Sequence, residues 1–239
     1  MSLADKLKKI LRKTLLGVDI SNYYFSQGGE DAILQNIFRK QLDSKTKGFF
    51  VDIGAFHPYK DSNTYLFYRN GWNGINIDAT PGSMAAFRKV RPRDINIECG
   101  VGETEQVMNY YVIAYDSTMN SFSKENLVAN GMFSEVTKTI PVKVLPLKKI
   151  LQQHEKLFSE IDLLTIDVEG FDFEVLSSND WIKYKPKVIA IELNVISIDD
   201  LSDHRSVKFL KNLSYTVVAK NVILNNVATV FFLRNDFNY

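Results

Sequence analysis

The chain has 239 residues, of which 45% are hydrophobic and 24% are charged, and its formal net charge is +1. This length and hydrophobic content favour a globular protein with a substantial core. The near-zero charge argues against a nucleic-acid partner, since nucleic-acid-binding domains are usually strongly basic.

The single cysteine, Cys99, excludes an intramolecular disulfide and a cysteine-based zinc site. This fits a reducing compartment. The N-terminus lacks the apolar core of a signal peptide, and no stretch approaches the ~18–20 apolar residues that span a bilayer. We therefore expect a cytoplasmic protein that is soluble, or at most peripheral at the inner face of the membrane.

Residues 3–16 predict a basic amphipathic helix that ends near Gly17. Leu3, Leu7 and Ile10 recur at helical spacing, and lysines and arginines occupy the other faces. Such a helix can lie in a membrane surface. More often its apolar stripe packs on the domain or on a sister subunit of a homo-oligomer. We treat residues 1–17 as this helix and residues 18–239 as a single domain.

Strands and helices alternate through most of the remaining chain, which predicts an α/β fold with a mostly parallel sheet and right-handed crossovers. The expected strands are Phe49–Ile53, Ile75–Ile77, Ile95–Glu98, Leu163–Ile166 and Val188–Leu193. The expected helices, which should cover both faces of the sheet, are Glu30–Arg39, Thr64–Arg69, Ser83–Lys89, Phe171–Leu176 and Asp200–Leu210.

Two regions depart from this alternation. Glu105–Ile113 and Thr139–Leu145 have β character and bracket a polar segment, a candidate lid or substrate loop that contains Met119, Asn120, Ser121 and Phe122. At the C-terminus, Tyr215–Ala219 and Ala228–Leu233 predict an antiparallel hairpin. An antiparallel pair at the end of a parallel sheet distinguishes methyltransferase sheets from all-parallel dinucleotide-binding sheets.

Three apolar runs end in acids at the sheet edge where open α/β sheets bind ligands. The runs are FFVDIGA (49–55), GINIDATP (74–81) and IDLLTIDVEG (161–170). They deliver Asp52, Asp78 and Asp167 to that edge. The repetition predicts an enzyme that acts on a small molecule.

The glycine pattern after the first of these runs favours S-adenosylmethionine (SAM) over a dinucleotide. A dinucleotide site needs G-x-G-x-x-G so that the backbone can approach the pyrophosphate. After Gly54 the chain continues Ala-Phe-His-Pro-Tyr, without a second glycine. SAM has no phosphate, so one glycine suffices. Asp52 suits the methionine ammonium and Asp78 suits the ribose hydroxyls. An NAD-dependent oxidoreductase is disfavoured.

Five strings in this order resemble the FkbM family of SAM-dependent methyltransferases. They are SQGGEDAIL (26–34), FFVDIGAFHPYKDSNT (49–64), GWNGINIDATP (71–81), DLLTIDVEGFDFEVL (162–176) and VIAIEL (188–193). The resemblance implies a Rossmann-like class I methyltransferase fold and O-methylation of hydroxyls, often on sugars or secondary-metabolite scaffolds. The turn Phe56-His57-Pro58 departs from the plainer turn common in the family.

The resemblance also implies the cofactor residues. Asp52 and Gly54 belong to the first SAM motif, and Asp78, with Ala79 beside it, to the ribose site. The backbone beside adenine is Cys99, Gly100 and Val101. Gln27, Asn63 and Thr64 fall in family-like strings near the cofactor.

A hydroxyl acceptor must lose its proton, so the site needs a base within reach of the acceptor. The candidates are Asp167, Glu169, His57 and Glu192. Asp167 and Glu169 rank first because their turn follows a central strand, although Asp and Gly are also ordinary turn residues. His57 has a simple structural interpretation, in which it caps its loop or packs on Tyr59.

Two further patterns have alternative explanations. Asp167, Glu192 and Asn194 carry oxygen ligands that suit a divalent cation, which some O-methyltransferases use to lower the pKa of a hydroxyl. The metal requirement stays open. Tyr65, Tyr68 and Trp72 can stack on a sugar ring, but packing in the core is the more common role of such aromatics.

Together these patterns predict a SAM-dependent O-methyltransferase for a sugar, a glycan or a similar polyhydroxylated acceptor. The alternative is a non-catalytic protein that retains the fold and docks on a glycan-assembly complex or a membrane through residues 3–16. The acids at four strand ends favour the enzyme, since a chain without catalytic function has no need to keep them.

Overall fold

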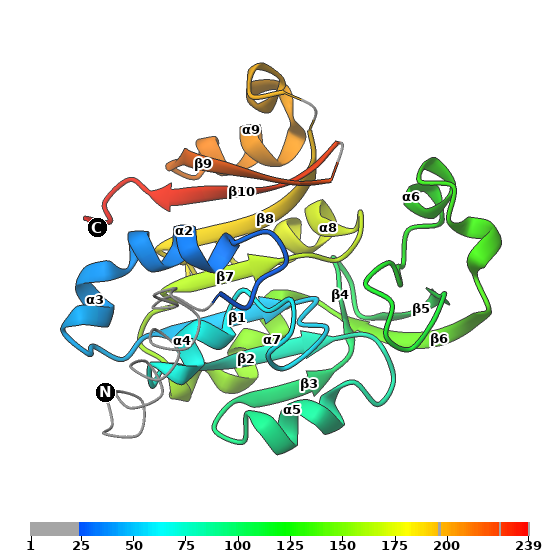
Figure 1. Cartoon of the computed structure of the whole chain (residues 1–239), viewed down its shortest axis with the longest axis horizontal. Helices are drawn as coiled ribbons and strands as arrows, with labels where there is room; N and C mark the ends of the chain where they lie inside the picture. Colours follow the sequence, from blue (N-terminus) through cyan, green and yellow to red (C-terminus); the bar gives the residue numbers. More distant parts are fainter. Residues whose placement is uncertain (1–23, 196, 225, 239) are drawn as a thin grey trace, which may run out of the picture.

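The computed structural model describes residues 24–195, 197–224 and 226–238 (Figure 1). The predicted N-terminal helix lies outside this range, so it remains a prediction. Among the described residues, no helix has both the length and the apolar character required to cross a membrane.

The fold is centred on a seven-stranded sheet with the order β3-β2-β1-β7-β8-β10-β9 (Figure 1). Its five parallel strands are β3 (Ile95–Glu98), β2 (Asn73–Asp78), β1 (Phe49–Ile53), β7 (Leu163–Ile166) and β8 (Val188–Asn194). The hairpin of β9 (Tyr215–Leu224) and β10 (Val227–Arg234) joins β8 through antiparallel β10. This order confirms the predicted class I methyltransferase fold.

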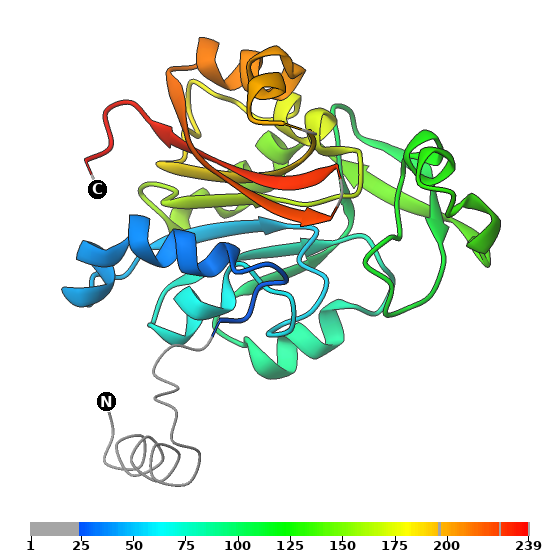
Figure 2. The ribbon, with the colours of Figure 1, turned by 45° about the horizontal axis from the view of Figure 1, so that its top comes forward.

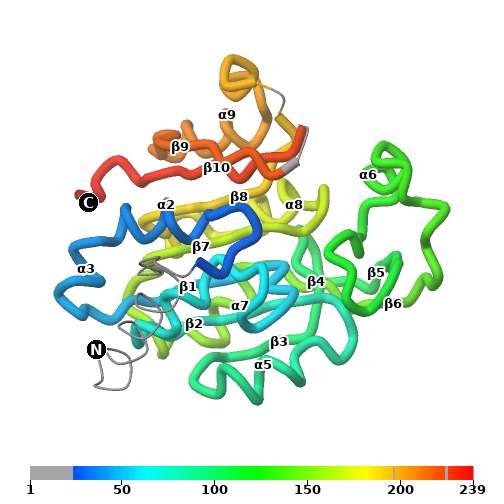
Figure 3. Tube along the Cα trace, in the orientation of Figure 1, coloured from blue at the N-terminus to red at the C-terminus, as the bar shows by residue number. Residues whose placement is uncertain are grey.

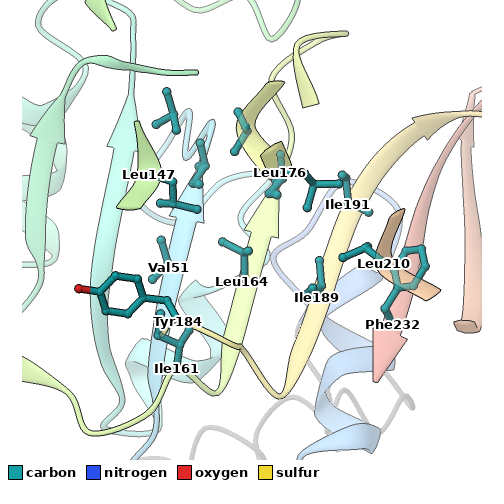
Figure 4. Packing of buried hydrophobic residues seen from close by; sticks show 14 of the residues in the cluster. Val51, Leu147, Ile161, Leu164, Leu176, Tyr184, Ile189, Ile191, Leu210 and Phe232 are labelled. Atoms are coloured by element: carbon teal, nitrogen blue, oxygen red, sulfur yellow. The ribbon is translucent and has the colours of Figure 1, made fainter. Parts of the chain in front are cut away.

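Helices cover both faces of the sheet because its central strands are apolar on both sides (Figure 2). Val51 and Phe50 of β1 belong to two different core clusters. The Val51 face packs against α7 (Leu147–His154), α8 (Asp172–Ser177) and α9 (Arg205–Asn212), as Figure 4 shows for Leu147, Leu176 and Leu210. The Phe50 face packs against α2 (Glu30–Ile37) and α4 (Tyr65–Arg69). The short helix α5 (Met84–Val90) lies beside β3.

The helix boundaries differ from the sequence prediction in two places. The predicted helix Glu30–Arg39 breaks at Phe38 into α2 and α3 (Arg39–Asp43), and the Phe38 ring packs on Phe67 and Trp72. The predicted helix Asp200–Leu210 starts as a 3-10 helix (Asp199–Asp203), because His204 caps α9 by accepting a hydrogen bond from the Ser206 N–H. Helices α6 (Lys124–Ala129) and α7 were not predicted.

The two irregular β segments form a second sheet of three strands, in the order β4-β6-β5. β4 (Gly100–Val101) pairs in parallel with β6 (Lys138–Leu145), and β6 pairs with antiparallel β5 (Gln106–Val112). Between β5 and β6 lie α6 (Lys124–Ala129) and a 3-10 helix (Phe133–Glu135). The Cα trace shows this β5–β6 insertion, residues 106–145, projecting beyond the carboxyl ends of the parallel strands (Figure 3).

Candidate active site

A cleft that is partly open to solvent lies where β1, β2 and β7 end. Four connections meet there: the turn after β1, the turn after β2, the residues around β4 and the turn after β7. The β5–β6 insertion supplies a further wall through Ser117, Thr118, Asn120 and Phe122. Binding at this edge is what an open parallel sheet predicts.

Nine of the predicted site residues line this cleft. They are Gln27, Gly54, Asp78, Ala79, Cys99, Gly100, Val101, Asp167 and Glu169. Five others lie outside its lining: Asp52, His57, Asn63, Thr64 and Glu192. The structure thus brings the predicted ribose and adenine residues together with two of the candidate bases.

Gly54 is required by the close approach of two turns. Its φ is +81°, and a Cβ at this position would lie 1.7 Å from the carbonyl oxygen of Asp167. The N–H of Gly54 donates to the carbonyl of Ile77 in the neighbouring strand. The turn after β1 is therefore pressed against the turn after β7, and no larger residue fits.

Asp78 organises the cleft through its carboxylate. One oxygen accepts the N–H of Phe56 at 3.1 Å and the other accepts the N–H of Thr80 at 2.8 Å. Burial raises the pKa of this carboxyl, and hydrogen bonds from Thr80, Ser83 and Phe56 oppose the shift. The acid therefore holds the turns after β1 and β2 while it lines the cleft.

Asp52 faces a buried polar network. Its two oxygens accept hydrogen bonds from the hydroxyls of Thr64 at 2.5 Å and Thr165 at 2.7 Å. The fully buried Arg91 donates to the Thr64 hydroxyl at 3.0 Å and pairs with the equally buried Asp94 at 2.8 Å. Sequence reasoning missed Arg91, because an arginine in the polar run RPRD (91–94) gives no sign of burial.

The insertion is hydrogen-bonded to the ribose side of the cleft. The hydroxyl of Tyr110 lies 3.2 Å from that of Thr80 and donates to the carbonyl of Asn120 at 3.3 Å. Phe122 packs on Tyr110, and its ring fills the space beside Gly100, where a Cβ would lie 2.5 Å from it. The segment proposed as a lid or substrate loop is thus part of the cleft wall.

Three acids meet at the far end of the cleft, and two of them, Asp167 and Glu169, line it. One carboxylate oxygen from each of Asp167, Glu169 and Glu192 lies within 4.8 Å of the others. Desolvation, followed by the charges of Glu30 and Asp52, raises the pKa of Asp167 to about 7. Desolvation and neighbouring acids raise the pKa of Glu169 to about 9 and that of Glu192 to about 11.

This arrangement can share protons or bind a cation. Glu192, which stays protonated at neutral pH, is hydrogen-bonded to Asp167. The oxygen-only donor set also suits a hard divalent cation. Asn194, also predicted as a ligand, is exposed, and Glu169 is the third acid beside Asp167 and Glu192.

His57 makes local contacts. Its Nδ1 accepts hydrogen bonds from the N–H groups of Tyr59 and Lys60, and its ring meets Tyr59 edge-on at 4.5 Å. Partial burial, then the Lys60 charge, lowers its pKa. A neutral His57 therefore carries its proton on Nε2. These contacts match the structural interpretation, and a catalytic role remains a prediction.

The aromatics considered for sugar stacking are largely core residues. Trp72 is 1% exposed and Tyr68 is 7% exposed. The Trp72 indole N–H donates to the carbonyl of Thr46. Both side chains pack in the cluster beneath α2 and α4, so neither offers a face to a ligand, and only Tyr65 is partly exposed.

The family model of the methyltransferase FkbM domain matches residues 52–217, which is more than half of the chain. The chain belongs to the FkbM methyltransferase family. The matched range starts at the acid ending β1 and includes all three acids of the cleft's far end. No curated protein sequence matches this chain.

Solved structures with similar folds are distant in sequence. Methyltransferase FkbM from Methylobacillus flagellatus has 12% identity and a TM-score of 0.46, covering 78% of this chain and 43% of that one. This chain thus spans less than half of that protein's length. An O-methyltransferase from Bacillus cereus in complex with S-adenosylhomocysteine (SAH) has 12% identity and a TM-score of 0.42. The match covers 98% of this chain and 92% of that one. A putative O-methyltransferase from Klebsiella pneumoniae has 13% identity and a TM-score of 0.41, and the match covers 96% of each chain.

Proposed function

We propose that this FkbM methyltransferase transfers a methyl group from SAM to a hydroxyl of a sugar, a glycan or a similar polyhydroxylated acceptor. The observation that carries the proposal is one cleft that contains the Gly54 turn, Asp78 and two acids of the group at its far end. A donor site and a candidate base therefore share one cavity.

The residues present fit SAM. Each oxygen of Asp78 accepts one backbone N–H and retains a lone pair that can accept a ribose hydroxyl. Gly100 and Val101 would lie beside adenine, and Gln27 and Gly54 would lie near the methionine end. The single glycine of the first turn suits a cofactor without a pyrophosphate.

When bound, SAM supplies an electrophilic methyl group that an acceptor oxygen attacks in line with the departing sulfur. Holding these atoms in line is chiefly a positioning task. A pKa of about 7 makes Asp167 suitable as a general base near neutral pH. Glu169 lines the same part of the cleft and is the second candidate for the base, although its pKa of about 9 means that it would act as a base mainly above neutral pH.

A divalent cation held by Asp167, Glu169 and Glu192 is a second route to the same chemistry. It would lower the pKa of an acceptor hydroxyl bound to it. We expect Mg²⁺ or Mn²⁺ to restore methyl transfer after EDTA treatment if this route operates. Activity that is unchanged after exhaustive chelation would leave the carboxylate base as the mechanism.

The docking alternative depends on residues 3–16, which the structure does not describe. The presence of Asp167 and Glu169 in the lining of a cleft favours an enzyme, because a docking protein would need no such cleft. Removal of residues 1–17, followed by liposome sedimentation and measurement of oligomer size, would test membrane contact and self-association separately.

The deciding experiment is isothermal titration with SAH, with NAD in parallel. Asp78→Ala removes a carboxylate that accepts two backbone N–H groups, and we expect it to weaken SAH binding about 10-fold or more. Asp180→Ala is the matched control, since Asp180 also accepts two backbone N–H groups but lies outside the cleft. Binding of NAD, or SAH binding that is equal in both variants, would contradict the assigned cofactor site. A screen of sugar acceptors with labelled SAM would follow.

A further inference from the structure

Glu169 has an unusual backbone conformation for its residue type. Its φ is +54°, in the left-handed region that side chains other than glycine rarely adopt. Such a conformation persists only where surrounding contacts hold it. The turn that contains Glu169 also contributes its carboxylate to the cleft.

Two side chains of the β5–β6 insertion hold this turn. The Ser121 hydroxyl and the Asn126 side-chain amide each donate a hydrogen bond to the carbonyl oxygen of Glu169, both at 2.8 Å. On the other side, Asp172 accepts the N–H groups of Val168 at 3.1 Å and Gly170 at 3.0 Å. The turn is thus fixed from both α8 and the insertion.

The approach of the insertion is close. Gly170 has a φ of +91°, and a Cβ there would lie 2.7 Å from the Cβ of Asn126. A glycine at this position is therefore what allows Asn126 to reach the neighbouring carbonyl.

The two donors are themselves well held. Ser121 is 1% exposed, and its backbone pairs with Tyr111 of β5 in both directions. The Asn126 N–H donates to the hydroxyl of Ser123, which caps α6. Both donors therefore belong to hydrogen-bonded parts of the insertion, and the bonds that they donate go to the backbone of the turn.

We propose that Ser121 and Asn126 are positioning residues, which act through the Glu169 carbonyl to hold its carboxylate in the acceptor end of the cleft. The inference rests on the proposed function, in which this acid faces the acceptor. It gives the insertion a second role besides forming part of the cleft wall: it sets the geometry of the turn that carries Glu169. Ser121 and Asn126 touch neither cofactor nor acceptor in this scheme.

The first test needs no acceptor. Hydrogen exchange of the amides of residues 168–171 would be compared between the wild type and a Ser121→Ala/Asn126→Ala variant. We expect at least 10-fold faster exchange in this turn and unchanged exchange in β7. Thr137→Val is the matched control, because the Thr137 hydroxyl bonds backbone carbonyls within the insertion and does not contact the turn. Unchanged exchange in the turn would overturn the proposal.

The second test uses the acceptor identified by the screen. The double variant should lower kcat about 10- to 100-fold with the KM for SAM unchanged, since a displaced catalytic group costs rate more than cofactor binding. Ser121→Thr keeps the hydroxyl and should retain most of the rate that Ser121→Ala loses. In a Glu169→Gln background, Ser121→Ala should have no further effect. An unchanged kcat in the double variant would overturn the proposal.

The tests of the turn and of the cofactor site can be distinguished, and a variant that does not fold can be replaced. If the double variant fails to fold, the single variants Ser121→Ala and Asn126→Ala each retain one donor and take its place in both tests. SAH titration tests the cofactor assignment, whereas amide exchange tests the turn. If the wild type does not bind SAH, the proposed function is therefore refuted, while the hydrogen-exchange test of the turn is unaffected.

Discussion

Replacement of Glu192 by glutamine should stabilise the protein at neutral pH. Glu192 is partly buried at the end of β8 beside Asp167 and Glu169. Desolvation, followed by the charges of these acids and of Asp172, raises its pKa from 4.5 to about 11. At pH 7 the side chain is therefore protonated in the folded protein and ionised in the unfolded chain.

The sign and magnitude follow from proton linkage. Because the folded state binds the extra proton, the free energy of unfolding is unaffected by this group below pH 4.5 and falls as pH rises above that value. The slope is about 1.4 kcal/mol per pH unit, which amounts to up to about 3 kcal/mol between pH 5 and pH 7. Glutamine binds no proton in either state, so Glu192→Gln removes this loss.

The assay is urea unfolding followed by tryptophan fluorescence between pH 4.5 and pH 8, in buffer with a chelator. We expect the variant and the wild type to be equally stable at pH 4.5 and the variant to be increasingly more stable at higher pH. Glu174→Gln is the control, because Glu174 makes an exposed ion pair with Arg205. A difference between Glu192→Gln and the wild type that stays constant over this range would refute the reasoning.

Three other outcomes are expected. Gly54→Ala places a methyl group against the facing turn and should cost about 3 kcal/mol or more of stability in thermal unfolding. Gly71→Ala, at a similar φ of +91° with open space around it, should cost only about 1 kcal/mol. Equal costs for the two variants would contradict the clash at Gly54. Arg91→Met leaves the Asp94 carboxylate buried without its partner and should cost about 3–5 kcal/mol of stability in urea unfolding. The loss should be smaller in the double variant Arg91→Met/Asp94→Asn. If adding Asp94→Asn restored no stability, the pairing of Arg91 with Asp94 would be contradicted. Burial raises the pKa of Cys99 from 9.0 to about 11, so at pH 8 its thiolate fraction is about 100-fold lower than that of a free thiol. Its reaction with iodoacetamide should be at least that much slower than that of a free thiol, and slower still with SAH bound. Fast alkylation of the folded protein would contradict the burial of Cys99.

Local patterns in the sequence were enough to predict the sheet. Apolar runs of strand length mark β1, β7 and β8, and the glycine after Asp52 marks the first turn. The residues at the strand ends, such as Asp78, could be assigned to the cleft because parallel strands present their carboxyl ends at one edge. These features depend on neighbours along the chain, which the sequence contains directly.

The tertiary structure alone decided which way the side chains face. Asp52 and Asp78 end neighbouring strands, yet Asp78 lines the cleft, whereas Asp52 is bound by two hydroxyls and linked to the buried Arg91. Asp52 is bonded by Thr64 and Thr165, which lie 12 and 113 residues away from it in the sequence. Their meeting depends on the order of the strands and the path of the loop, which no local pattern specifies.

The acid group shows the same limit. Glu192 was predicted near Asp167 because both follow neighbouring strands, but Asn194 was expected as the third ligand. Asn194 lies two residues beyond Glu192 on the same strand and is exposed. Glu169 lies beside Asp167 and Glu192, and side chains from an insertion more than 40 residues away bond the carbonyl of its left-handed turn. Spacing in the sequence specified the candidates, and contacts across the sheet edge determined which of them meet.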